Sequence, residues 1–352
     1  MSDEIFFFDF HGILVKVLIN DKESAKFIET DFSYFYIDPG EATRTPDITL
    51  SVFLSPPPYE KIPEGTLAAY HTKDAAVYKH GEMTYYDYAG EALVVYDDRH
   101  DSAKIYSLDR NFLYEKTYLM VMSRVGMELD RKKLHRIHAM GVVFEGRTIL
   151  CLLPMGGGKT TLTLSLLEKK AFSLLSEEVP LVSSGGRLYP MPVRMGVTAG
   201  TPLSIPEKFL KPFQRSHYKP KTLIDINYFK DQIAPVAKPG FVFVGKRIHS
   251  AKPKIIKISR LKAFGPVFRL CVMGVGLPQL LEYVLRFDLL SMVGRISIFS
   301  SRLSASLALL RQSETYELHL SYDRSANAAL VNDFVSKKHR EYGEGSKHES
   351  TV

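Results

Sequence analysis

The sequence predicts an α/β protein in two parts, a β-rich first part and a second part organised around a strand, a glycine loop and a helix. Short strand-like runs joined by turns fill residues 1–108, and a helical pattern covers 111–129. An apolar run over 147–153 then ends in three glycines that precede a leucine-rich helical pattern. The 352 residues are enough for two domains of this kind.

The first part is expected to consist of short strands joined by turns. Residues 5–10 and 13–19 flank His11-Gly12, which predicts a hairpin. Further strands are expected at 48–54, 75–79, 84–88, 92–96 and 104–108. The many tyrosines and phenylalanines here are interpreted as sheet packing. Asp109 is the expected N-cap of the following helix.

The second part begins between about 108 and 132, so we assign residues 1–130 to a first domain and 131–336 to a second. A hairpin over 142–144 and 148–153 is expected to lead into the glycine loop, and residues 206–238 to form a long loop. Later strands are expected at 172–175, 179–182, 188–189, 241–244, 255–258 and 316–320, and helices at 278–287 and 303–310. Residues 337–352 are polar and are expected to be a disordered tail.

Composition indicates a folded protein of a reducing compartment. Apolar residues make up 45% of the chain, and both cysteines, Cys151 and Cys271, lie in apolar runs without a CxxC motif. The first residues lack the pattern of a signal peptide, and arginines interrupt the apolar stretch 289–310, so we expect a cytoplasmic protein without a membrane span. The net charge of +7 suits phosphorylated ligands or acidic partners, and no nucleic-acid-binding motif accompanies it.

The glycine loop has the order of a phosphate-binding loop. Glycines let successive backbone N–H groups converge on phosphate oxygens, and the following helix contributes its positive N-terminal end. Lys159 would reach the β- and γ-phosphates and Thr160 would hold Mg²⁺, although Leu153 stands where the usual pattern has its first glycine. A glycine-rich turn without a ligand is the alternative. The expected nucleotide-binding residues are Met155, Gly156, Gly157, Gly158, Lys159, Thr160 and Thr161.

Phosphoryl transfer also requires a base for the attacking hydroxyl. Glu177 and Glu178 end a short apolar run that we expect on the strand beside the loop strand. Adjacent residues of a strand point to opposite faces, so one acid would face the γ-phosphate and the other Mg²⁺ or a basic neighbour. An exposed acidic turn is the alternative for this pair. His138 would orient the base or stabilise charge, unless it is an ordinary core histidine.

Several basic residues are further candidates for contacts with a phosphate or an acidic acceptor. Arg194 follows a proline-rich turn, and Lys246 and Arg247 follow the apolar run 241–244. Taken singly, each of them is better explained as an ordinary surface charge. The sequence shows no Ser-His-Asp pattern, no zinc-ligand spacing and no GxGxxG motif.

Together, these segments resemble the C-terminal domain of the HPr serine kinase/phosphorylase family and its HPr-kinase-like relatives. His138 precedes Lys159 by 21 residues, and Glu178 follows it by 19. Residues 172–179 are similar to the family segment R-L-L-S-D-D-x-V, and the turn at 185–190 is similar as well. The resemblance covers about 130 to 335. It implies a P-loop kinase domain with a mixed sheet, of the type shared with phosphoenolpyruvate carboxykinases, preceded here by a smaller β-rich α+β domain.

The resemblance also implies the roles of the site residues. Glu178 takes the place of the catalytic base, His138 that of the active-site histidine, and Lys159 that of the nucleotide-binding lysine, while Thr160 and Glu177 would hold Mg²⁺. Both family aspartates are glutamates here. The glutamate that precedes the family's R-G-x-G segment is missing near Arg194, so phosphorylase activity and HPr itself as acceptor are not expected.

The leading hypothesis is a cytoplasmic, ATP- and Mg²⁺-dependent kinase of the HPr-kinase-like group. It would transfer the γ-phosphate to a hydroxyl, that of a serine in a protein, in a peptide or as the free amino acid. The alternative is an ATP-binding interaction or regulatory protein with a degenerate kinase site, and a third hypothesis is a simple NTPase. No nucleic-acid partner is expected, and a homo-oligomer would follow from the family likeness alone.

Overall fold

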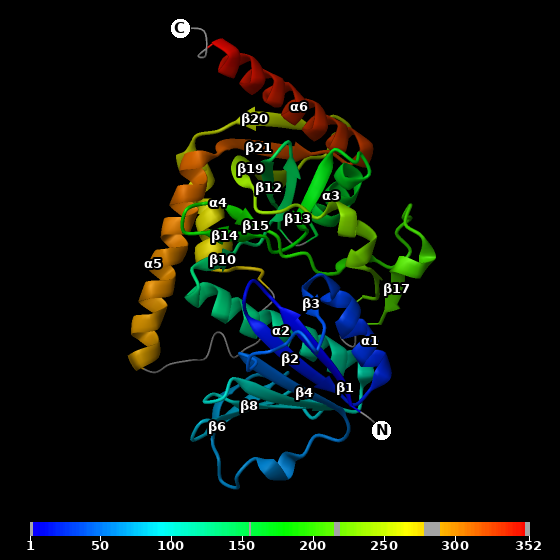
Figure 1. The fold of residues 1–352 in the computed structure, drawn as a ribbon, viewed down its shortest axis with the longest axis vertical. Helices are drawn as coiled ribbons and strands as arrows, with labels where there is room; N and C mark the ends of the chain where they lie inside the picture. The colour runs from blue at the N-terminus through cyan, green and yellow to red at the C-terminus, as the bar shows by residue number, and fades with distance from the viewer. Residues whose placement is uncertain (1–2, 155, 215–218, 278–288, 349–352) are drawn as a thin grey trace. The chain divides into compact units, whose positions relative to one another are not determined.

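The computed structural model describes residues 3–154, 156–214, 219–277 and 289–348, and shows a mixed α/β protein (Figure 1). The chain forms two compact units. Unit 1 comprises Met1–Leu129, Val193–Tyr228 and Pro278–Ser291, and unit 2 comprises Asp130–Pro192, Phe229–Leu277 and Met292–Val352. Residues 193–228, which the sequence analysis assigned to the second domain, therefore belong to unit 1.

Unit 1 contains a nine-stranded sheet in the order β3-β1-β2-β4-β9-β8-β7-β6-β5. The hairpin expected around His11-Gly12 is confirmed, and β4 is parallel to both of its neighbours, β2 and β9. The strands are β1 (Glu4–Asp9), β2 (Leu14–Ile19), β3 (Tyr36–Ile37), β4 (Ile48–Leu54), β5 (Ala68–His71), β6 (Ala76–His80), β7 (Met83–Asp87), β8 (Ala92–Asp97) and β9 (Ser102–Ser107).

Two helices belong to this sheet, α1 (Lys22–Asp31) and α2 (Arg110–Arg131). Asp109 caps α2 as expected, because its carboxylate accepts hydrogen bonds from the backbone N–H groups of Asn111 and Phe112. Aromatic rings join the layers: Phe32, just after α1, packs edge-on against Phe8 and stacks on Tyr118 of α2. These rings are buried, so the aromatic residues do serve sheet packing.

Part of the segment expected to be a long loop, residues 206–238, instead belongs to a small sheet of unit 1. The strands of this sheet are β16 (Met195–Thr198), which precedes the segment, and β17 (Leu210–Phe213) and β18 (Lys221–Ile224), which lie within it, in the order β16-β18-β17. Arg194, beside β16, is partly exposed and packs against α1 and α2, where it forms an ion pair with the buried Asp31 and lies 3.6 Å over the ring of Tyr118. These short strands were not predicted because the segment is rich in prolines and lysines and shows no clear apolar pattern of a strand.

Unit 2 contains a six-stranded mixed sheet in the order β13-β11-β12-β19-β21-β20. Strands β12, β19 and β21 run parallel, and the remaining pairs are antiparallel. The strands are β11 (Met140–Phe144), β12 (Arg147–Leu152), β13 (Phe172–Ser176), β19 (Lys238–Arg247), β20 (Lys254–Lys257) and β21 (Glu314–Leu320). A second, three-stranded sheet consists of β10 (Leu134–Arg136), β14 (Leu181–Ser183) and β15 (Leu188–Tyr189).

Helices cover both faces of the six-stranded sheet. On one face, Phe334 of α6 (Arg324–His348) packs against Phe241 and Phe243 of β19. On the other face, Val242 belongs to a core shared with α4 (Arg260–Val267) and α5 (Leu289–Gln312). This alternation along β19 follows from the two-residue period of a strand. A single π-helical turn, Phe268–Val272, continues α4.

Two C-terminal expectations meet different outcomes. The helix expected at 278–287 lies outside the described residues. The prediction of a disordered tail from residue 337 was wrong for residues 337–348, because α6 continues to His348 (Figure 1). Its apolar stripe anchors it to the sheet, and Arg147 lies 4.2 Å over the ring of Tyr342. The polar sequence from residue 337 onward did not predict this helix, because its contacts are with strands that are distant in the sequence.

Candidate functional site

The glycine loop joins the carboxyl end of β12 to the first turn of α3 (Lys159–Leu167). Gly156 and Gly158 have φ values of 71° and 98°, a left-handed region that only glycine adopts readily. A Cβ on Gly157 would lie 2.9 Å from the carbonyl oxygen of Pro154. Each of the three glycines therefore meets a steric requirement of the turn. Met155, which was expected to bind nucleotide, lies outside the described residues.

Gly158 is the N-cap of α3, and no side chain caps this helix end. Backbone N–H groups of a helix N-terminus that lack such a cap suit an anion. Thr161 lies in the same first turn and is partly exposed. The glycine conformations and the uncapped end of α3 are features that a phosphate site would use, whereas the Gly157 N–H is engaged by the carbonyl oxygen of Pro154 at 3.0 Å.

Leu153, in place of the usual first glycine, is accommodated by a glycine on the neighbouring strand. Its side chain is fully buried over Gly245 of β19, where a Cβ would lie 2.3 Å from Cδ2 of Leu153. The loop therefore tolerates a leucine at this position because the residue that faces it on the parallel strand β19 is a glycine without a side chain. Gly245 was not singled out from the sequence, since this pairing depends on the register between β12 and β19.

The side chain of Lys159 is buried at the base of the loop. Its ammonium donates one hydrogen bond to the carbonyl oxygen of Leu153 and one to Nε2 of His138, both at 2.9 Å. Burial lowers the pKa of Lys159, while the charges of Glu177 and Glu178 act in the opposite direction. Both glutamates therefore lie close enough to the ammonium to influence it.

His138 is almost fully buried beside this ammonium, just before β11. Burial and then the charge of Lys159 lower its pKa to about 4. The ring is therefore neutral at pH 7, and because an ammonium cannot accept a hydrogen bond, Nε2 is the acceptor and Nδ1 carries the proton. Among the described residues, Nδ1 has no hydrogen-bond partner. The sequence alone could not distinguish this arrangement from an ordinary core histidine.

The two glutamates occupy a bend after β13, which corrects two expectations. They do not alternate across a strand, and β11 separates β13 from the loop strand β12. Glu177 reaches α3, where Thr160 Oγ1 donates a 2.7 Å hydrogen bond to its Oε1. The backbone of Glu178 is fixed because its carbonyl oxygen accepts from the N–H of Ala139 at 3.1 Å.

Thr160 and Glu177 offer the oxygen ligands that Mg²⁺ prefers. A hydroxyl and a carboxylate oxygen 2.7 Å apart fit a Mg²⁺ site in which phosphate oxygens and water complete the coordination. Within the described part of the chain, no group of three or more His, Cys, Asp or Glu side chains could hold a metal ion by itself. The residues present therefore suit a metal that arrives with a phosphorylated ligand.

Arg247 is a further cation at the loop. Its Nη1 lies 3.8 Å from the position that a Cβ on Gly158 would occupy, at the carboxyl end of β19. The neighbouring Lys246 is instead paired with Glu317 at 2.8 Å. Arg194, the third candidate from the sequence, is bound to Asp31 inside unit 1 and serves packing there. Of the three, the structure brings Arg247 to the glycine loop.

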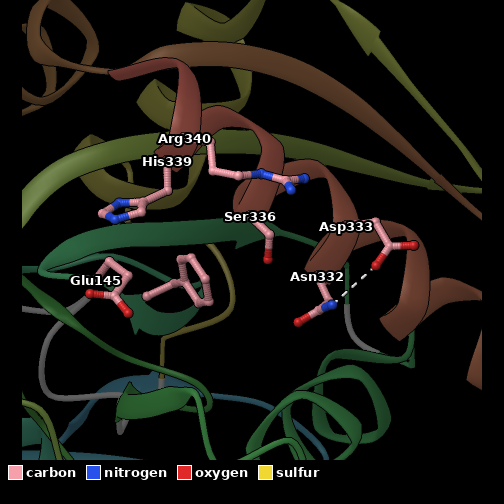
Figure 2. A pocket seen from close by; sticks show the side chains of 7 residues that line it. Glu145, Asn332, Asp333, Ser336, His339 and Arg340 are labelled. Carbon is pink, nitrogen blue, oxygen red and sulfur yellow. Dashed lines mark hydrogen bonds between the residues drawn. The ribbon is translucent and has the colours of Figure 1, made fainter. Parts of the chain in front are cut away.

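A cavity of about 440 Å³ lies elsewhere in unit 2, beside α6 (Figure 2). Glu145 and Phe144 of the β11–β12 turn line it together with polar side chains of α6. This turn lies at the start of β12 and the glycine loop lies at its end. The six-residue strand therefore separates the cavity from the glycine loop by roughly 20 Å. The cavity is thus separate from the glycine loop.

Among the described residues, no helix is both long and apolar enough to cross a bilayer. The chain matches no protein-family model and no curated protein.

Proposed function

We propose that this protein is an ATP- and Mg²⁺-dependent kinase of the HPr-kinase-like type, and that it transfers the γ-phosphate to a hydroxyl, most simply that of a serine. The observation that carries the proposal is the convergence of His138, Lys159 and the Glu177-Glu178 pair at the glycine loop. Their contacts join β11, α3 and the bend after β13. A glycine-rich turn of purely structural character does not require a buried lysine between a histidine and two acids.

The proposed roles follow from the positions of the side chains. The loop amides and the N-terminal end of α3 bind the phosphates, while Lys159 and Arg247 neutralise charge that develops on the transferred group. Thr160 and Glu177 would hold Mg²⁺, which would offset the negative charge of the phosphates. Glu178 accepts the proton of the acceptor hydroxyl, and its fixed backbone keeps the carboxylate near the loop.

His138 positions Lys159 in this proposal. A neutral imidazole accepts a hydrogen bond from the ammonium without competing for its charge. Lys159 is then held at the base of the loop until phosphate oxygens replace Leu153 O and His138 as its partners. The cytoplasmic location and the acceptor class, a protein, a peptide or free serine, remain part of the proposal.

Replacement of the two glutamates tests the base assignment. Glu178→Gln is expected to lower the rate of acceptor phosphorylation by about 10²–10⁴-fold while ATP binding is retained. Glu177→Gln is the matched control, because it removes an equal charge one residue away and should weaken Mg²⁺-dependent ATP binding. Full transfer by Glu178→Gln to the acceptor used by the wild type would show that Glu178 is not the base.

A second candidate function is ATP binding without transfer, in support of a regulatory interaction. Two contacts favour it: Lys159 is bonded to Leu153 O and His138, and the Gly157 N–H donates to Pro154 O at 3.0 Å. Groups that bind phosphate elsewhere are thus engaged within the chain. This candidate predicts ATP binding that requires Lys159 and no acceptor-dependent release of ADP. A simple NTPase would release ADP without any acceptor.

A further inference from the structure

A buried histidine in unit 2 lies between an aspartate and a serine that have no role in the proposed nucleotide site. Nδ1 of His135 lies 2.8 Å from Oδ1 of Asp130, and its Nε2 lies 2.8 Å from Oγ of Ser301. His135 and Asp130 are fully or almost fully buried, whereas Ser301 is partly exposed on α5. The three side chains come from the end of α2, from β10 and from α5.

The charge of Asp130 determines the direction of the hydrogen bonds in this group. Arg302 donates to both carboxylate oxygens of Asp130, at 3.0 and 2.5 Å. Despite burial, the hydrogen bonds from His135 and Arg302 and the charge of Arg302 lower the pKa of Asp130, so it is ionised. An ionised Asp130 can only accept, so Nδ1 of His135 donates to it. The remaining ring nitrogen, Nε2, is the one that faces the hydroxyl of Ser301 and can accept its proton.

Ser301 differs in this contact from Ser300 and Ser306 on the same helix. These two serines, like Ser313 just after α5, each donate to a carbonyl oxygen of the preceding turn, the usual bond of a helical serine. The hydroxyl of Ser301 instead meets an imidazole that an aspartate orients. A serine, a histidine and an aspartate in this order and at these distances have the geometry of an activated nucleophile.

We infer that Ser301 is a reactive nucleophile, with His135 as its general base and Asp130 as the residue that orients the base. Its substrate class is an acyl ester or a similarly electrophilic phosphorus compound. In the first step, Ser301 Oγ forms a bond to the electrophilic carbon or phosphorus, and the hydroxyl proton passes to Nε2 of His135. The bond to the leaving group then breaks, and the leaving group takes that proton. Water next attacks the same centre and gives its proton to His135, which passes it to Ser301 Oγ as the bond to the product breaks. This inference does not depend on the proposed kinase activity.

The first test uses the whole chain and a fluorophosphonate probe. Attack by Ser301 forms an O–P bond and releases fluoride, so peptide mass spectrometry should find the adduct on Ser301 and none on the more exposed Ser300. Ser301→Ala should abolish the labelling. If Ser301 carries no adduct when the folded wild-type protein is treated, the inference is overturned.

The second test avoids any change to the buried pair. The thiols introduced by Ser301→Cys and Ser300→Cys are alkylated with iodoacetamide, and their rates are compared. Because the imidazole promotes thiolate formation, Ser301→Cys should react roughly tenfold faster although its side chain is less exposed. Burial raises the pKa of Cys151 to about 12 and of Cys271 to about 11, so the native thiols should not compete. A rate for Ser301→Cys at or below that of Ser300→Cys would also overturn the inference.

Discussion

The ammonium of Lys159 donates a 2.9 Å hydrogen bond to Nε2 of His138, and both groups are buried below the glycine loop. This contact joins the first turn of α3 to the residue that leads into β11. Burial, and then the charge of Lys159, lower the pKa of the histidine and keep it neutral, while Lys159 also donates to the carbonyl oxygen of Leu153. The charge state of His138 is therefore linked to both the stability and the proposed chemistry of unit 2.

His138 should make stability depend on pH. Its pKa of about 4 in the folded protein lies below the ordinary value of about 6.5, so the unfolded chain binds a proton first as the pH falls. Stability is then complete above pH 6.5 and is lost towards pH 4. Between pH 7 and pH 5, the loss from this residue is about 2 kcal/mol.

Urea unfolding of wild type and His138→Gln at these two pH values measures the effect. The wild type should lose more stability than the variant on acidification, by the amount given above, because glutamine does not titrate. Other groups that titrate contribute equally to both proteins and cancel in the difference. Equal losses in the two proteins would show that His138 is not held neutral by its surroundings.

Gly245→Ala should disturb the glycine loop from the neighbouring strand. The added Cβ would lie 2.3 Å from Cδ2 and 2.5 Å from Cγ of the buried Leu153. We expect a loss of about 1–3 kcal/mol in the free energy of unfolding. The double variant Gly245→Ala/Leu153→Ala should lose less than the two single changes together predict, because the clash is absent.

Gly265→Ala provides the matched control for that experiment. Gly265 lies in α4, and a Cβ there would meet no atom within 4 Å. Alanine is the better helix former, but Pro266 follows directly and a Cβ before a proline disfavours the helical conformation, so stability should change by no more than about 1 kcal/mol. A Gly245→Ala protein as stable as Gly265→Ala would contradict the proposed packing of Leu153.

Arg247→Ala should weaken the binding of ATP–Mg²⁺. A charge-assisted hydrogen bond is worth about 1.5–3 kcal/mol, which corresponds to roughly a 10–100-fold loss of affinity. Lys246→Ala removes the adjacent cation, which is paired with Glu317, and should leave affinity nearly unchanged. Isothermal titration calorimetry compares the two variants. Equal effects would indicate that general positive charge, rather than the position of Arg247 at the loop, governs binding.

Arg194→Met should destabilise the protein without affecting nucleotide binding. It leaves the buried carboxylate of Asp31 without the guanidinium that neutralises it, and loss of one partner of a buried ion pair costs about 3–5 kcal/mol. Thermal unfolding should show a clear decrease in the midpoint. At a temperature where the variant is folded, a large decrease in ATP affinity would argue for a role of Arg194 in the site.

Local patterns were sufficient for much of the fold. The hairpin β1–β2, the strand β4, the helix α2 with its cap and the hairpin β11–β12 were all predicted from apolar periodicity and turn residues. Helix α1 and the strands of residues 193–228 were missed. Arg194, whose partner Asp31 lies 163 positions away, shows the reason: the contacts that hold this segment are distant in sequence.

The residues of the candidate site were selected by spacing, but their contacts were not predictable. The expected alternation of Glu177 and Glu178 was wrong, because β13 ends at Ser176 and the chain bends there. The role of Gly245 required the register of two parallel strands. In the group of Asp130, His135 and Ser301, the histidine and the serine are 166 positions apart, so no local sequence motif could predict it.

Release of ADP from ATP–Mg²⁺ tests the central claim most directly. It is measured with and without hydroxyl acceptors, namely free serine, serine peptides and HPr-like proteins, for the wild type and for Lys159→Ala. The account predicts ADP release that increases with one acceptor class, coincides with phosphate on that acceptor and is lost in Lys159→Ala. Binding of ATP that requires Lys159, without acceptor-dependent ADP release from any of these compounds, would contradict it.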